Sequence, residues 1–304
     1  MRIERVNGII LNERSYKESS KILDIITKEY GIIGVIAKGS KNLKSNLRSY
    51  TTKLTYAEFQ INYKEGKLST LIDASIIDPL NDLRKDLLRI SYASFMLDLT
   101  SQVLKENDNK KIYDILVSCL LKINEGMDPE VMCHILELKY LSYIGIAPNF
   151  EGCSVCGKSK VVTLSASHGG FVCLEHQTNE RIVDPKTLRI IKMLYLIDID
   201  KITKTDVSDK IKKEIDKFID EYYDRYTGYY LKSKEFLNNI KYSYIYKIYI
   251  CRFFYMKKLG PLLLLFSTTF SSLILLVLFK LFTILNTVLA FLNIGFTSFI
   301  IGIA

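Results

Sequence analysis

The chain has 304 residues, which is enough for about two domains of ordinary size. It carries 42 lysines and arginines against 33 aspartates and glutamates, so its net charge of +9 favours an anionic partner: nucleic acid, an acidic peptide or a membrane surface. The N-terminal residues are charged and open into strand-like sequence, so we expect no signal peptide. The six cysteines are spread too unevenly for a disulfide framework, so we expect a cytoplasmic protein.

Residues 1–78 show the pattern of a small β domain. In residues 54–64 and 68–78 apolar and polar side chains alternate around the turn at Glu65-Gly66, which is typical of a half-buried hairpin. The predicted strands cover residues 3–12, 21–27, 32–38, 54–64 and 68–78. Five short strands with a long loop after the third fit a closed barrel of the oligonucleotide-binding (OB) type, and an open meander sheet is the alternative.

The loop after the third predicted strand is strongly basic. The sequence GIIGVIAKGSKNLKSNLRSYTT starts as an apolar strand and turns at Gly39 into a cationic segment. No acidic residue lies between Glu29 and Glu58, so we expect nothing nearby to neutralise these charges. Small polar spacers here can donate to phosphate oxygens, and neutralised phosphates release counterions. The candidate DNA-binding residues are Lys38, Lys41, Lys44, Arg48 and Lys53. A solvated surface loop is the alternative, and Tyr50 and Tyr56 are either base-stacking residues or packed sheet residues.

From residue 79 to about 238 the apolar spacing becomes helical. Helices are predicted to start at Asp78-Pro79, Asp128-Pro129 and Asp184-Pro185, because Asp caps a helix and Pro suits its first turn. Two more are predicted over residues 110–124 and 207–222. On the last helix the solvent-facing residues are expected to be Lys210, Lys212, Lys213, Glu214 and Lys217. His134 lies among apolar neighbours and the acidic residues form no catalytic pair, so an enzyme is not expected.

A cysteine cluster interrupts the helical region at residues 150–178. Cys153-x-x-Cys156 is followed by Cys173-x-x-His176, a spacing typical of tetrahedral zinc sites with three Cys and one His. Four ligands fill the coordination sphere, so the zinc, one per chain, is expected to be structural. A redox CxxC pair is the alternative, and His168 could replace His176 as the fourth ligand.

The strand, AKG turn and basic loop, together with the cysteine insertion, resemble the RecO family of bacterial recombination mediators over about residues 1–238. The resemblance implies an α+β protein: an OB-type barrel (1–78) and a helical domain (79–238) with a zinc-binding insertion. It implies binding of single- and double-stranded DNA, strand annealing, association with RecR and with the acidic tail of the single-strand binding protein, and indirect help to RecA. It places DNA contacts at Lys38 and Lys41, with Lys44 and Arg48 in the same loop, and zinc at Cys153, Cys156 and Cys173. The fourth family position is most often Cys and is His176 here.

The segment 239–304 departs from that pattern. Lys280 is the only charged residue between Leu259 and Ala304, and residues 261–279 and 281–303 are each long enough to cross a bilayer. A membrane anchor, a partner surface and out-of-frame translation are the three interpretations. We favour the last because the composition changes abruptly with no linker.

The leading hypothesis is therefore a cytoplasmic, nucleoid-associated DNA-binding mediator without catalytic activity. One alternative is a membrane-anchored zinc-containing scaffold or adaptor whose basic loop contacts anionic lipid, with membrane attachment possible only through 259–304. A zinc-containing nucleic-acid enzyme is the third hypothesis.

Overall fold

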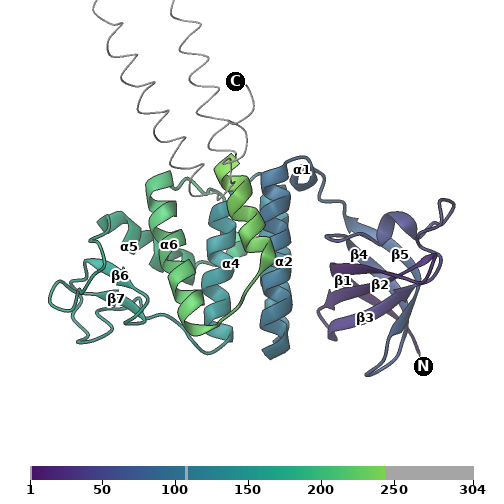
Figure 1. Ribbon diagram of the computed structural model, residues 1–304, viewed down its shortest axis with the longest axis horizontal. Helices are drawn as coiled ribbons and strands as arrows, with labels where there is room; N and C mark the ends of the chain where they lie inside the picture. The colour runs from purple at the N-terminus through teal and green to yellow at the C-terminus, as the bar shows by residue number, and fades with distance from the viewer. Residues whose placement is uncertain (1, 107–108, 244–304) are drawn as a thin grey trace, which may run out of the picture. The chain divides into compact units, whose positions relative to one another are not determined.

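The computed structural model describes residues 2–106 and 109–243 (Figure 1). Its first part is a closed five-stranded barrel with the order β1-β2-β3-β5-β4. The strands are β1 (Arg2–Tyr16), β2 (Ser20–Thr27), β3 (Gly31–Ala37), β4 (Tyr56–Tyr63) and β5 (Ser69–Asp78). The predicted OB-type barrel and α+β class are confirmed, and the open meander sheet is wrong.

The barrel closes because β1 is long enough to pair with two neighbours. Its first half runs antiparallel to β4, from Arg2 opposite Tyr63 to Ile9 opposite Tyr56, and its second half pairs with β2. The register shifts between Ile10 and Asn12, a bulge of the kind that bends a strand around a barrel. Inward-facing side chains from all five strands fill the interior, among them Val6, Ile10, Leu23, Val35, Phe59 and Leu71.

The remainder of the described chain is helical apart from the cysteine insertion. Its helices are α1 (Asn81–Arg84), α2 (Leu87–Glu106), α3 (Lys110–Asn124), α4 (Pro129–Tyr143), α5 (Pro185–Leu196) and α6 (Asp209–Tyr226), with a further helical stretch at residues 232–243. Ten of the fifteen residues of α4 are buried, which makes it the central helix; α2, α3, α5 and α6 all contact it (Figure 1).

Two of the three predicted Asp-Pro helix starts are confirmed. Asp128 accepts hydrogen bonds from the backbone N–H groups of Glu130 and Val131, and Asp184 accepts one from Lys186. The predicted start at Asp78-Pro79 is wrong. Leu80 adopts a left-handed backbone (φ 51°) that separates Pro79 from the short α1. The long helix α2 starts later, where Asp86 accepts from the N–H groups of Leu88 and Arg89.

The barrel and the helices share one hydrophobic core. Ile9, Leu11 and Ile26 from the barrel wall pack with the residues of α2, α3 and α4. Arg84 reinforces the junction by donating from Nη2 to the Leu54 carbonyl oxygen at 2.9 Å. Because this core is continuous, the described residues up to Tyr242 form one compact unit.

Within the described residues we find no helix with the length and apolar character needed to cross a bilayer. The two segments long enough to cross a bilayer, 261–279 and 281–303, lie outside the described residues, and so does the choice among the three interpretations of the tail.

Candidate nucleic-acid interface and metal centre

The basic loop, residues 38–55 between β3 and β4, is anchored to the barrel at several points. The Lys41 backbone N–H donates to the Ser19 carbonyl oxygen at 2.9 Å, and Leu54 donates to Ile10 at the same distance. The Lys21 ammonium donates to the Thr51 carbonyl oxygen at 2.8 Å and also pairs with Glu13. The loop therefore presents its side chains from a backbone that is already ordered, which lowers the entropy lost on binding.

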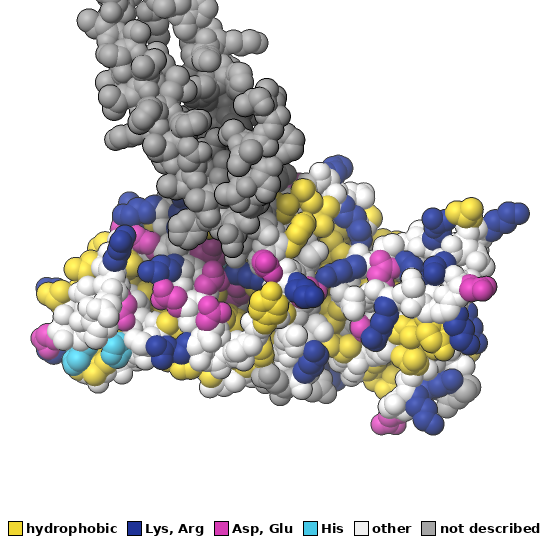
Figure 2. Space-filling view, viewed as in Figure 1, with side chains coloured by type: hydrophobic (Ala, Val, Ile, Leu, Met, Phe, Trp, Pro, Cys, Tyr) yellow, Lys and Arg dark blue, Asp and Glu magenta, His cyan; other side chains and the backbone are white. Residues whose placement is uncertain are grey.

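Four of the five candidate DNA-binding residues are exposed and have no acidic partner among the described residues. The side chains of Lys38, Lys41, Lys44 and Arg48 lie at the surface, and within the described part of the chain none has a carboxylate within 4 Å. Figure 2 shows several Lys and Arg side chains, in dark blue, over the barrel. The exposed positive charge that the local sequence predicted is present at these four positions, and their role in DNA binding stays a prediction.

Lys53 is different. Its ammonium lies 2.7 Å from Asp98 of α2, a carboxylate 45 positions away in the sequence. The prediction that nothing neutralises the charges of this segment is therefore wrong for Lys53. The absence of acidic residues between Glu29 and Glu58 could not reveal a partner on a distant helix.

The two tyrosines considered for base stacking both pack inward. Tyr50 packs against the barrel core, and Tyr56 packs against the shared core beside Tyr113. The structure instead brings Tyr16 and Lys17, at the turn from β1 to β2, beside the basic loop through the contact of Ser19 with Lys41. Sequence reasoning missed this pair, although its place at a turn between two predicted strands was an available signal.

The four predicted metal ligands converge in the insertion. The Sγ atoms of Cys156 and Cys173 are 3.8 Å apart, and His176 Nδ1 lies 3.7 Å from Cys153 Sγ and 3.3 Å from Cys173 Sγ. All four donor atoms lie within 4.8 Å of one another. A tetrahedral site with Zn–S bonds of about 2.3 Å requires S···S edges of roughly 3.8 Å, so the spacing fits such an ion. His168 lies apart, with Nδ1 2.9 Å from Ser165 Oγ.

Backbone hydrogen bonds prepare the cluster for a cation. Burial would raise the pKa of the Cys153 thiol, but N–H groups of Cys156, Cys173 and Val155 outweigh that effect and lower it to about 6. The pKa of Cys173 is also lowered, since hydrogen bonds from His176 outweigh burial. Metals bind thiolates and not thiols, so this donor set suits a metal such as zinc.

The insertion is joined to the helices by aromatic side chains. Phe150 and Phe171 lie 4.9 Å apart, and Phe150 also contacts Tyr195 of α5 and Phe218 of α6. The hairpin of β6 (Thr163–Ser165) and β7 (Gly170–Val172) leaves no space at Gly170, where a Cβ atom would lie 2.2 Å from the Asn149 carbonyl oxygen. This close backbone approach fixes the hairpin beside the segment that leads into the cluster.

A buried ionic network lies between α4, α6 and residues 232–243. The Lys234 ammonium is 2.8 Å from Asp220 and 3.2 Å from Glu137, and Lys241 lies 2.7 Å from Glu130 and 2.8 Å from Asp216. Sequence reasoning missed this network, because its members are scattered over more than a hundred positions.

His134 and Lys212 belong to the same region. Nε2 of His134 is 3.2 Å from Asp216, and burial would raise the pKa of Asp216, yet His134, Lys234 and Lys241 hold it well below its usual range. The prediction that Lys212 faces solvent is wrong: its side chain is only 13% exposed and its ammonium pairs with Asp128 at 3.0 Å. Burial would lower the pKa of Lys212, but Asp128, with Asp209 and Glu130, raises it.

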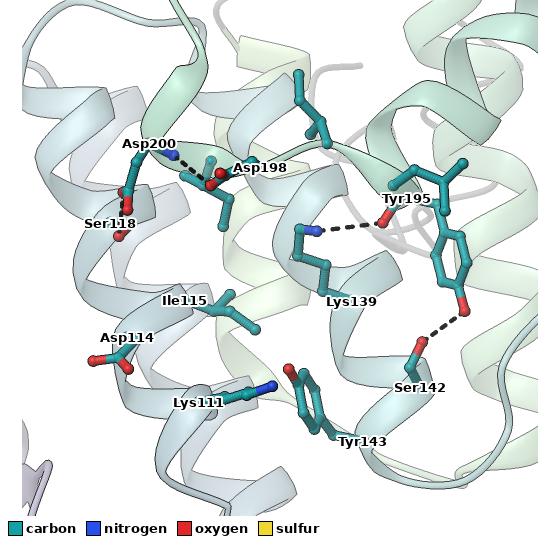
Figure 3. A pocket seen from close by; sticks show the side chains of 13 residues that line it. Lys111, Asp114, Ile115, Ser118, Lys139, Ser142, Tyr143, Tyr195, Asp198 and Asp200 are labelled. Carbon is teal, nitrogen blue, oxygen red and sulfur yellow. Dashed lines mark hydrogen bonds between the residues drawn. The ribbon is translucent and has the colours of Figure 1, made fainter.

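A pocket of about 440 Å³ opens between α3, α4 and the segment after α5 (Figure 3). Ile115 and Tyr143 supply apolar surface, while Lys111 and Lys139 supply positive charge. Lys139 donates to the Tyr195 carbonyl oxygen at 3.3 Å, and burial lowers its pKa.

Three aspartates also line the pocket, but each has its own partner. Asp114 pairs with Lys28, Asp198 with Lys201, and Asp200 accepts from the Ser118 hydroxyl. Lys28 and Lys201, which do not line the pocket, therefore partly neutralise Asp114 and Asp198, whereas Asp200 keeps its charge.

Comparison with known proteins agrees with this architecture. The family model described as Recombination protein O N terminal matches residues 1–80, and that described as Recombination protein O C terminal matches residues 84–235. The chain is 32% identical over 242 residues to the DNA repair protein RecO of Bacillus cytotoxicus, which covers 78% of this chain and 97% of the relative. It is 33% identical, with the same coverage, to the proteins of that name from Bacillus cereus strain AH187 and Bacillus anthracis. The chain therefore belongs to the recombination protein O family.

Proposed function

We propose that this protein is a DNA-binding mediator of recombinational repair that acts without catalysing a reaction. It binds single- and double-stranded DNA, anneals complementary strands and, with RecR, helps to load RecA onto DNA coated by the single-strand binding protein. The observation that carries the proposal is the set of exposed cations without carboxylate partners on an ordered barrel loop: Lys38, Lys41, Lys44 and Arg48. In this assignment residues 1–78 contact DNA, and residues 79–238 dock protein partners.

Annealing requires a surface that reduces repulsion between two polyanions, and no bond is made or broken. Lysine and arginine side chains bind phosphate oxygens and release condensed counterions, which drives association with either strand. Lys53 contributes less than the other loop cations, since Asp98 already neutralises it at 2.7 Å.

The metal proposed for the insertion is one zinc ion held by Cys153, Cys156, Cys173 and His176. The donor set and its spacing support this assignment. With four protein ligands no coordination position remains for a substrate, so the ion would stabilise the insertion and take no part in chemistry.

The pocket of Figure 3 is our candidate for the acidic tail of the single-strand binding protein. A carboxylate there would meet Lys111 and Lys139, and an apolar side chain would meet Ile115 and Tyr143. The pairing of Asp114 with Lys28 and of Asp198 with Lys201 supports this assignment, because it lowers their repulsion of an acidic peptide.

The test is annealing of complementary strands with and without RecR and single-strand binding protein. We expect the full-length chain to accelerate annealing, and a variant with Lys38, Lys41, Lys44 and Arg48 replaced by Ala to lose most of that activity. A matched control replaces three other exposed lysines and one arginine: Lys160, Lys186, Lys213 and Arg189. Equal loss in both variants, or no annealing by the unmodified protein, would contradict the proposal.

A further inference from the structure

Two exposed apolar side chains flank the cations of the basic loop. Leu43 lies between Lys41 and Lys44 and is 85% exposed, more than any other large hydrophobic residue in the described part of the chain. Tyr16, at the end of β1, is 37% exposed. Each side chain exposes apolar surface that a suitable ligand could bury.

Hydrogen bonds join the two turns that carry Tyr16 and Leu43. The turn after Tyr16 is joined to the loop by the 2.9 Å bond from the Lys41 N–H to Ser19. A second bond, 3.3 Å from the Gly39 N–H to Ser20 Oγ, fixes the same junction.

The exposure of Leu43 is a fixed feature of the loop. The loop turns twice around it, through bonds from Asn42 N–H to Gly39 at 3.0 Å and from Ser45 N–H to Asn42 at 3.1 Å. These turns hold the leucine outward, with an exposed lysine two positions before it and another directly after it.

Strain at the neighbouring turn supports a functional role for this surface. Lys17 has φ 52°, a left-handed conformation that costs a side-chain-bearing residue about 1–2 kcal/mol. Glycine would adopt this conformation without that cost. The lysine instead places its ammonium 5.4 Å from the centre of the Tyr16 ring, which adds a cation beside the aromatic surface.

We propose that Leu43 and Tyr16 contact the unstacked bases of a single strand while the surrounding lysines hold its phosphates. The inference rests on the proposed DNA-binding function and adds a base-contacting surface to it. Phosphate contacts do not require unpaired bases, whereas apolar and aromatic contacts to bases require a strand whose bases are accessible. These two side chains would therefore strengthen binding of the barrel to single strands and would help to keep their bases unstacked for pairing.

The small apolar area of the two residues favours nucleic acid over lipid as the ligand. Interfacial membrane binding needs a broad apolar face, because its strength grows with the apolar area inserted. One leucine and one partly exposed tyrosine among lysines offer little such area, but they suit stacking and wedge contacts with individual bases.

The experiment compares binding to a thymidine strand with binding to an abasic strand of the same length, which keeps every phosphate and lacks every base. The full-length protein should bind the thymidine strand more tightly. Leu43→Ser combined with Tyr16→Ala should weaken thymidine binding roughly fivefold to a hundredfold and leave abasic binding unchanged. A control variant, Ile3→Ser with Tyr230→Ala, removes exposed side chains away from this surface and should behave as the unmodified protein.

Equal affinity of the unmodified protein for the two strands would overturn the base-contact inference and leave DNA binding intact. Failure to bind either strand would overturn the proposed function as well. Leu43→Ser alone cannot harm the core, so an unchanged ratio of the two affinities in that variant and in the double variant would also overturn the inference. Vesicles of phosphatidylserine and phosphatidylcholine form the last arm, and Leu43-dependent flotation with unchanged strand binding would assign the surface to lipid instead.

Discussion

Replacing Lys234 by Met should destabilise the helical domain strongly. The Lys234 ammonium lies 2.8 Å from Asp220, 3.2 Å from Glu137 and 4.0 Å from Asp216, and the Glu137 side chain is only 3% exposed. Methionine fills a similar volume but leaves the Glu137 carboxylate buried without its cation. Removing one partner of a buried ion pair costs about 3–5 kcal/mol of unfolding free energy. For a chain of this size that corresponds to a Tm lower by about 6–20 °C.

The loss should depend on pH in a defined direction. Burial raises the pKa of Glu137 above its usual value, and Lys234 opposes that rise, so the variant should have a higher Glu137 pKa still. A carboxyl whose folded pKa lies above its unfolded pKa costs stability at high pH and regains it as falling pH protonates the group. The deficit of the variant should therefore be larger at pH 8 than at pH 5.

Urea unfolding followed by circular dichroism at both pH values measures the effect. Lys232→Met removes an exposed lysine from the same helical stretch and should change stability by less than about 0.5 kcal/mol. A deficit for Lys234→Met no larger than that of the control, or one that grows as the pH falls, would refute the reasoning.

Three further predictions concern other parts of the molecule. Cys173→Ser should abolish binding of about one zinc ion per chain, measured by elemental analysis, and should lower Tm. Cys119→Ser, which changes a cysteine outside the cluster, should retain the metal, and equal metal content in the two variants would exclude this site. Gly170→Ala should lower the unfolding free energy measured in urea by about 1–3 kcal/mol, because the new methyl group would lie 2.2 Å from the Asn149 oxygen. Gly126→Ala, where the space is open, is the control, and an equal or larger effect there would contradict the close approach at Gly170. Lys53→Ala should weaken DNA binding, measured by fluorescence anisotropy, less than Lys41→Ala does. It should also lower the unfolding free energy by up to about 1 kcal/mol, because Asp98 loses its partner. Equal losses of affinity in the two variants would count against the pairing of Lys53 with Asp98.

Local periodicity was sufficient to predict the barrel. The alternation of residues 54–64 reports directly which side chains face the interior, since Ala57, Phe59 and Ile61 are buried, and both β4 and β5 lie close to the predicted bounds. In β5 the alternation does not mark the interior: Ile72 and Ile76 are exposed while Leu71 and Ala74 are buried, because the register against β4 shifts along the strand. The Asp caps at 128 and 184 are equally local, since each carboxylate bonds N–H groups two or three positions ahead. Asp78 failed as a helix start because the left-handed backbone at Leu80 depends on how the chain leaves the barrel.

Partners that are distant in sequence were beyond local reasoning. Lys53 and Asp98 are 45 positions apart, and Glu137 and Lys234 are 97 apart. Lys212 occupies a position that helical spacing assigns to solvent, but the cap of α4 brings Asp128 beside it. Charge runs therefore predict a basic surface, while the identity of the cations that stay available depends on the tertiary fold.

The salt dependence of single-strand binding tests the central claim most directly, namely that the basic loop binds phosphates through unpaired cations. Each phosphate contact contributes about 0.7 to the slope of log affinity against log salt concentration on single strands. Replacing Lys38, Lys41, Lys44 and Arg48 by Ala should therefore reduce the magnitude of the slope by about 2.8, that is four contacts of 0.7 each. An unchanged slope in this variant, with the fold intact by circular dichroism, would contradict the account.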